Sequence, residues 1–194
     1  MLEESARPAN VRSRILQAAY KLFSEGGVGA VGVDAIVSES GCAKSSLYNN
    51  FESKEDLAIA FLKEREALWT KNWLEASVRR KAVTPEDRLM AIFDVLDTWF
   101  RSATFEGCSF INVMLESPKG SAVREAAARH LANCRQMVAD LARQARLVDP
   151  DSFSQAWHML MKGSIVAAGE GHRSAAVDAR RAATMLLKGW ARSD

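Results

Sequence analysis

The sequence contains few of the residues that interrupt helices. It has four prolines and eleven glycines among 194 residues, and both residue types disfavour the interior of a helix. It also lacks segments in which polar and apolar residues alternate strictly, the pattern typical of half-buried strands. The scarcity of helix breakers therefore favours a helical chain over a loop-rich or all-β chain.

Cysteine is also scarce. The three cysteines, at positions 42, 108 and 134, form no C-x-x-C pair, and an odd, sparse count argues against a disulfide framework. No apolar run approaches the length of about 20 residues that spans a bilayer. The first ten residues, MLEESARPAN, lack the apolar stretch of a signal peptide. We expect a cytoplasmic protein that makes no membrane contact.

An excess of charge of one sign is absent as well. Lysine and arginine total 26 against 24 aspartates and glutamates, which leaves a net charge of +2. Proteins that coat nucleic acids usually carry a larger positive charge, so any contact with nucleic acid must be local. Hydrophobic residues make up 48% of the chain, which is ordinary for a globular protein.

Apolar residues recur at steps of three and four along most of the chain, which predicts an all-α protein with about nine helices. Ser53 with an acid three residues later, and Thr84 followed by Pro85, are typical helix starts. The predicted helices cover residues 15–26, 33–40, 44–50, 53–77, 85–100, 109–116, 121–146, 150–168 and 175–191.

Residues 33–51, VDAIVSESGCAKSSLYNNF, have the layout of a helix-turn-helix, with a turn after Gly41. The apolar residues that would hold its two helices together are Ile36, Val37, Leu47 and Phe51. The second helix would expose Lys44, Ser45, Ser46 and Asn49. These side chains suit base edges and phosphates. Two short helices that only turn a corner would give the same pattern, so both interpretations remain open at this point.

A longer pattern resembles the N-terminal domain of the tetracycline-repressor (TetR) family of regulators. The matching residues are Ile15-Leu-x-Ala-Ala-x-x-Leu-Phe23, Gly26-Gly27, Val33-x-x-Ile36 and Gly41-x-x-Lys44-x-x-Leu47-Tyr48-x-x-Phe51-x-Ser53-Lys54-Glu55-x-Leu57. The resemblance implies a homodimeric transcription factor, usually a repressor that a small ligand releases from DNA. It implies base or phosphate contacts for Lys44, Ser45, Ser46 and Asn49, and phosphate contacts for Tyr48 and Lys54.

The sequence departs from the family pattern at the starts of the two short helices. Ala43 stands where the family has a capping Ser or Thr, and an alanine cap costs about 1 kcal/mol. Gly32 and Val33 stand where the family prefers a threonine that touches phosphate. Asp34 favours the helix dipole and repels phosphate. We interpret these departures as weaker or retuned DNA contact.

We assign no function to two other features of the sequence, a glycine motif and the histidines. Residues 27–32 match G-x-G-x-x-G, but a dinucleotide site needs a preceding strand, and here a helix precedes the motif. The three histidines share no ligand spacing with each other or with a cysteine. We therefore expect core or surface histidines, no metal, no cofactor and no enzyme activity.

Residues 60–165 are rich in aromatic side chains and methionine, which form ordinary core or line apolar pockets. Given the resemblance, we expect some of them to bind an apolar or amphipathic effector. The candidates are Trp69, Trp73, Phe93, Trp99, Cys108, Phe110, Asn112, Met114, Trp157 and Met161. Cys108 at a helix start is either a reactive sensor or a small thiol that packs a tight corner.

The sequence thus predicts an arm over residues 1–9, a helix-turn-helix domain over 10–55 and a ligand-binding and dimerisation domain over 56–194. Small residues on the last two helices favour close helix packing in a homodimer. The predicted function is a ligand-responsive regulator, more specifically a repressor, that binds a near-palindromic operator in double-stranded DNA. The alternatives are a small helical enzyme or ligand carrier, and a dimeric helical protein that has lost DNA binding.

Overall fold

The computed structural model describes residues 10–193, and every regular element within them is helical. The predicted arm over residues 1–9 lies outside the described residues. The elements are α1 (Val11–Gly26), α2 (Val33–Ser40), α3 (Lys44–Asn50), α4 (Lys54–Arg65), η1 (Glu66–Glu75), α5 (Ala76–Lys81), α6 (Pro85–Phe100), α7 (Ser109–Glu116), α8 (Ala122–Gln144), α9 (Pro150–Gly169) and α10 (Ala175–Gly189). Because α4, η1 and α5 are continuous, residues 10–193 form nine helical rods, which confirms the predicted class and number.

The predicted helix starts have the expected hydrogen bonds. The Ser53 hydroxyl accepts from the Asp56 amide at 3.1 Å at the start of α4. The Thr84 hydroxyl accepts from the Asp87 amide at 3.1 Å, and Pro85 occupies the first turn of α6. Each cap satisfies an amide that has no partner within the helix. These two starts are therefore fixed by local sequence.

The continuous rod from α4 to α5 differs from the predicted helix in length and in form. It extends to Lys81, four residues beyond the predicted end at residue 77, and its middle third, η1, is a π-helix. A π-helix is wider than an α-helix because its hydrogen bonds join residues five apart. In η1, Thr70 and Leu74 face inward and are buried, whereas Trp69 and Trp73 remain partly exposed.

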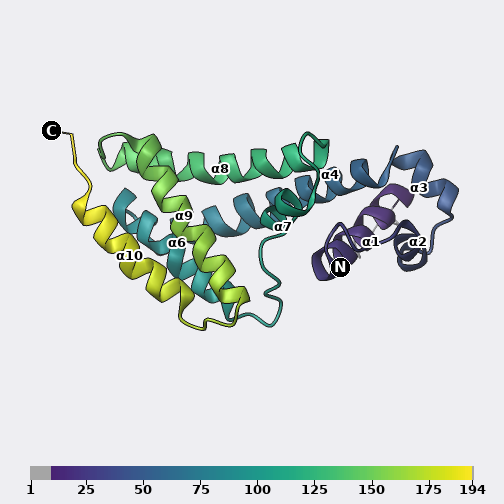
Figure 1. The fold of residues 1–194 in the computed structure, drawn as a ribbon, viewed down its shortest axis with the longest axis horizontal. Helices are drawn as coiled ribbons and strands as arrows, with labels where there is room; N and C mark the ends of the chain where they lie inside the picture. The colour runs from purple at the N-terminus through teal and green to yellow at the C-terminus, as the bar shows by residue number, and fades with distance from the viewer. Residues whose placement is uncertain (1–9, 194) are drawn as a thin grey trace, which may run out of the picture.

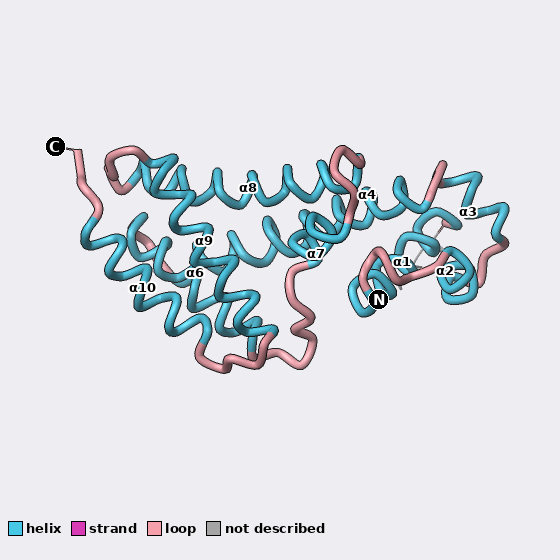
Figure 2. The backbone as a smooth tube through the Cα atoms, viewed as in Figure 1, coloured by secondary structure: helices cyan, strands magenta, loops and turns pink. Residues whose placement is uncertain are grey.

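The molecule is elongated, with α1–α3 at one end and α6, α9 and α10 at the other (Figure 1). The rod that begins with α4 leaves the α1–α3 end and runs beside α8 (Figure 2). At the opposite end, α10 packs against α6 and α9. None of the helices described in residues 10–193 is long and apolar enough to cross a membrane.

Buried apolar side chains form two clusters. The head core contains those of α1, α2, α3 and α4, together with Phe110 and Val113 of α7 and Val123 and Ala127 of α8. The body core contains those of α5, α6, α9, α10, the end of η1 and the second half of α8. The head core thus extends past residue 55 and joins α1–α3 to two helices far along the chain.

Candidate nucleic-acid interface

The turn between α2 and α3 is held by glycine and by a side chain of α1. Gly41 has a φ of 60°, and its amide donates to the Ser38 carbonyl at 3.3 Å. A Cβ atom on this glycine would lie 3.1 Å from a guanidinium nitrogen of Arg14. That guanidinium donates to the carbonyls of Ser40 and Gly41 at 2.9 and 3.2 Å. The turn is therefore fixed relative to α1.

The packing between α2 and α3 follows the prediction. Ile36, Leu47 and Phe51 are almost fully buried in the head core, and Val37 is partly buried against it. The Arg12 guanidinium lies 4.6 Å from the centroid of the Phe51 ring and covers it from α1. Since these side chains hold α3 by one face, the opposite face is directed outward.

The outward face of α3 presents most of the predicted contact residues. Lys44, Ser45, Tyr48 and Asn49 are exposed, and Tyr48 keeps 48% of its surface accessible. Ser46 is only partly exposed, and its carbonyl accepts from the Asn50 side chain at 2.8 Å. The face therefore offers one cation and several short hydrogen-bonding groups to a molecule outside the chain.

Lys44 already has an ionic partner on this surface. Its ammonium lies 2.9 Å from the carboxylate of Asp34 in the first turn of α2, and both side chains are largely exposed. The hydrogen bond to Asp34, assisted by the charge of this carboxylate, raises the pKa of Lys44. A phosphate at this position would have to compete with Asp34 for the lysine.

Lys54 lies three residues after Phe51 and begins α4. Its ammonium donates to the Gly29 carbonyl at 3.3 Å, in the loop between α1 and α2. The N-terminus of α4 adds a positive dipole end, which favours an anion there. The lysine thus ties the loop to α4 at the helix end where the resemblance implies a phosphate contact.

The two departures seen in the sequence appear as missing caps. Neither Gly32 before α2 nor Ala43 before α3 supplies a side-chain hydrogen bond. By contrast, the Asn10 side chain accepts from the Ser13 amide at 2.8 Å and caps α1. An asparagine before an apolar helical pattern is a known start signal, and α1 accordingly begins four residues before the predicted start at residue 15.

The ten predicted effector contacts do not line one cavity. Trp69, Trp73 and Trp99 border a groove of about 410 Å³. Cys108 and Asn112 border a second pocket of about 470 Å³, next to the end of α9. The remaining five belong to the two cores or pack against them: Phe93, Trp157 and Met161 in the body core, Phe110 in the head core and Met114 against it. Phe110 also borders a pocket of about 380 Å³ beside α4 and α8. Effector binding by any of the ten stays a prediction.

The environment of Cys108 favours a packing role. The residue precedes α7, where a helix dipole would lower a thiol pKa. Burial has the larger effect and raises the pKa of the Cys108 thiol, against hydrogen bonds from the amides of Ile111 and Phe110 that lower it. The thiol is therefore protonated at neutral pH, whereas a reactive sensor needs the thiolate.

Two of the histidines are buried between helices. His130 is 2% exposed, stacks on the Phe110 ring and lies 3.4 Å from the sulfur of Cys134. Burial lowers the pKa of His130 to about 4, although Glu66 opposes this shift. Burial likewise lowers the pKa of His158 to about 4. Within residues 10–193, no group of three or more His, Cys, Asp or Glu side chains could hold a metal ion.

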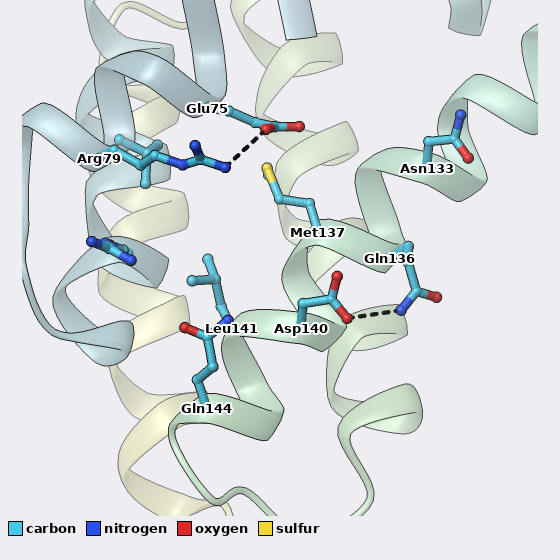
Figure 3. A pocket seen from close by; sticks show the side chains of 10 residues that line it. Glu75, Arg79, Asn133, Gln136, Met137, Asp140, Leu141 and Gln144 are labelled. Carbon is cyan, nitrogen blue, oxygen red and sulfur yellow. Dashed lines mark hydrogen bonds and ion pairs between the residues drawn. The ribbon is translucent and has the colours of Figure 1, made fainter. Parts of the chain in front are cut away.

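A further pocket of about 330 Å³ lies between α5, α6 and α8 and contains none of the predicted contacts (Figure 3). Two polar pairs border it, Glu75 with Arg79 at 3.5 Å and Gln136 with Asp140 at 3.0 Å. Met137 and Leu141 supply an apolar wall from α8. The sequence pattern of α8 gives no signal for this pocket, because its lining comes from three separate helices.

The geometry described so far defines a helical protein with an N-terminal helix-turn-helix domain. Residues 15–61 match the family described as "Bacterial regulatory proteins, tetR family". The HTH-type transcriptional regulator QacR of Staphylococcus aureus is 32% identical over 72 residues, which are 37% of this chain and 38% of QacR. The matched segment thus spans less than half of that relative.

Solved structures extend the similarity over nearly the whole chain. A structure assigned as a TetR transcriptional regulator of Streptomyces avermitilis has a TM-score of 0.85 and 26% identity, covering 95% of this chain and 100% of that chain. A TetR-family regulator of Streptomyces coelicolor has a TM-score of 0.85 and 24% identity, covering 94% and 90%. Residues 15–61 therefore match the TetR family, and the fold of nearly the whole chain is that of TetR-family regulators.

Proposed function

We propose that this protein is a cytoplasmic transcriptional repressor that binds a near-palindromic operator as a homodimer and is released by a small molecule. The observation that carries the DNA-binding part is the outward face of α3, which is exposed while its opposite face is buried against α1 and α2. A helix presented in this way fits the major groove of DNA, where base edges can be distinguished.

Each exposed residue has a role in this proposal. The Asn49 amide and the Ser45 hydroxyl face base edges, and the Tyr48 hydroxyl binds a phosphate. Lys44 exchanges Asp34 for a phosphate, and Lys54 binds a second phosphate at the start of α4. Phosphate contacts position the helix and base contacts select the sequence.

The exposed apolar residues of α9 and α10 support dimerisation. Met159 and Met185 are 62% and 70% exposed, and Val166 and Val177 are also exposed. Small residues such as Ala182 lie on the same two helices, and these permit close approach between helices. A two-fold dimer would place two α3 helices in successive major grooves, about 34 Å apart.

We propose that residues 10–55 form the DNA-binding domain and residues 56–194 the effector-binding domain. Release by an effector requires a connection between these two domains. A hydrogen bond and a close approach supply one. The carboxylate of Glu55 accepts from the Val123 amide at 3.2 Å, where α8 begins. A Cβ atom on Gly29 would lie 3.4 Å from a carboxylate oxygen of Glu116, at the end of α7. A change in α7 or α8 therefore reaches the head directly.

Selection from random duplexes with the full chain tests DNA binding. We expect a near-palindromic motif at low salt. Lys54→Ala should weaken binding to all duplexes and reduce the slope of log affinity against log salt by about one unit. Lys71→Ala, on the exposed side of η1, is the matched control and should leave the slope unchanged. Failure to recover any motif would favour the alternative, a dimeric helical protein without DNA binding, which the two uncapped helices also allow.

A further inference from the structure

Three of the five tryptophans border one groove between the head, residues 10–53, and the body, residues 54–193. The ring centroids of Trp69, Trp73 and Trp99 lie 5.0 to 6.5 Å apart, and all three side chains are partly exposed. The opposite wall comes from α1 and includes Tyr20 and Glu25. Partly exposed indoles gathered in one groove form a contiguous aromatic surface, which is the kind of surface that marks a binding site.

The chemistry of this wall selects a flat molecule with positive charge. The face of an aromatic ring carries partial negative charge, and tryptophan attracts cations more strongly than the other aromatic residues.

The charges around the groove point in the same direction. Glu25 and Glu106 border it and are exposed, and neither has an ion-pair partner within the described residues 10–193. Their carboxylates are therefore free to attract a cation at the mouth of the groove.

The two cations of the groove are already engaged. The Lys21 ammonium is paired with Glu39 at 2.8 Å. The Arg65 guanidinium donates to the Ser24 hydroxyl at 2.8 Å and lies 5.7 Å from the centroid of the Tyr20 ring. The protein thus already places one of its own cations on an aromatic ring in this groove.

We propose that the groove binds a flat aromatic molecule with a fixed positive charge. The regulatory role of this molecule rests on the function proposed above, whereas its binding does not. Because α1 supplies one wall, and η1, Trp99 and the loop after α6 supply the other, the occupant touches the head and the body together. It therefore stabilises one orientation of α1 relative to η1, and a ligand shifts a population only through such a difference.

Isothermal titration calorimetry with the full chain, without DNA, tests the site. The probes are N-methylquinolinium, the neutral 1-naphthylmethanol and the anionic 1-naphthoate, which have similar size and shape. We expect N-methylquinolinium to bind about tenfold more tightly than 1-naphthoate, with the neutral compound between them. The preference should shrink as salt is added, because the carboxylates at the mouth are exposed.

Two variants locate the binding site. Glu106→Gln should weaken N-methylquinolinium binding by about two- to fivefold and leave 1-naphthylmethanol binding unchanged. Trp99→Phe keeps an aromatic ring with a weaker attraction for cations and should weaken binding by a similar factor. Trp190→Phe is the matched control. Its ring packs on Phe153 in the body and its nitrogen donates to the Val148 carbonyl, so N-methylquinolinium binding should not change.

The outcomes separate the site from its role. The proposal is overturned if the cation binds no more tightly than 1-naphthoate, or if both groove variants fold normally by circular dichroism and bind it unchanged. A chain that binds the cation in the groove and selects no DNA motif removes the proposed function and keeps the site. A chain that binds both, with DNA affinity unaffected by the cation, removes the regulatory role.

Discussion

The head and the body differ in how completely their buried polar atoms are satisfied. Six buried side-chain atoms have no hydrogen-bond partner within the described residues: Glu64 Oε2, Trp69 Nε1, Thr70 Oγ1, Asp97 Oδ1, His130 Nδ1 and Trp157 Nε1. All six lie on the rod, α6, α8 or α9, and none lies in residues 10–53. In the head, the buried Ser40 hydroxyl donates to the Val37 carbonyl at 3.1 Å.

This difference corresponds to the two proposed tasks, DNA binding by the head and effector binding by the body. A surface that recognises a DNA sequence must hold its side chains in one arrangement. A closely packed head whose buried polar atoms are hydrogen-bonded does so. An unsatisfied buried group costs about 1–3 kcal/mol, and such groups are rare in folded proteins. Of the six residues, only Trp69 borders the groove proposed to bind a cation, whereas Trp157 is fully enclosed in the body core. The unsatisfied atoms therefore show a less closely matched body and not a single binding site.

The largest effect is expected when the pH is lowered, because the two buried histidines lie in the body and acid should destabilise its packing. The pKa values of His130 and His158 are about 4 in the folded state, below the ordinary value of 6.5. The unfolded chain therefore binds more protons between these two values, so stability falls as the pH is lowered from 6.5 and levels off near 4. Each histidine contributes about 3 kcal/mol to this fall.

Urea unfolding followed by circular dichroism at several pH values measures this effect. His158→Gln should flatten the dependence between pH 6.5 and 4. His172→Gln is the matched control, because His172 is exposed and paired with Asp178, so the dependence should persist. Equal slopes for wild type and His158→Gln would show that His158 is not held neutral in the fold.

The next largest effect is expected in the head core. Leu47 is fully buried between α2 and α3, and Leu47→Ala removes its packing and leaves a cavity. We expect a loss of about 3 kcal/mol in unfolding free energy and of all sequence-specific DNA binding. The matched control is Leu115→Ala, since Leu115 is 67% exposed and its truncation should change stability by less than about 0.5 kcal/mol. An intact DNA affinity in Leu47→Ala would show that α3 is not positioned by this contact.

The head was more predictable from sequence than the body for a physical reason. The residues that hold α2 to α3 are separated by short stretches of chain, so helical periodicity identifies Ile36, Leu47 and Phe51 together. The lining of each body pocket comes from helices far apart in sequence. The sequence predicts Trp69 and Trp157 only as aromatic residues that form core or line a pocket, and it could not show that one borders a groove and the other fills the core.

Two features of the structure have no local signal at all. The π-helical form of η1 depends on how the rod packs against its neighbours, since its sequence is compatible with an α-helix. The ion pair between Lys44 and Asp34 joins two helices, and the sequence predicts only the separate effects of the two residues. Pairwise contacts of this kind require the tertiary structure.

A smaller gain is expected from repairing a cap in the head. Ala43→Ser would supply a hydroxyl that accepts from an amide in the first turn of α3, which now has no side-chain partner. We expect an increase of about 1 kcal/mol in unfolding free energy and tighter DNA binding. Ala35→Ser, at an exposed position inside α2, is the control and should not stabilise the fold. No gain from Ala43→Ser would indicate that α3 is already fixed by its packing.

The smallest expected effect separates the two roles of Asp34. Asp34→Asn keeps the size of the side chain, frees Lys44 and removes a negative charge from the surface proposed to face DNA. We expect DNA affinity to rise by about two- to fivefold at low salt, because Lys44 no longer has to leave Asp34 to bind a phosphate and a negative charge no longer faces the DNA. Folding stability should fall slightly, since an acid in the first turn of α2 favours the helix dipole. Glu39→Gln is the matched control: it breaks an exposed pair of similar length, with Lys21, at the other end of α2. A gain in affinity with Asp34→Asn and none with Glu39→Gln would place Lys44 against the DNA backbone, whereas equal affinities for both variants would show that the pair of Lys44 and Asp34 does not face the DNA.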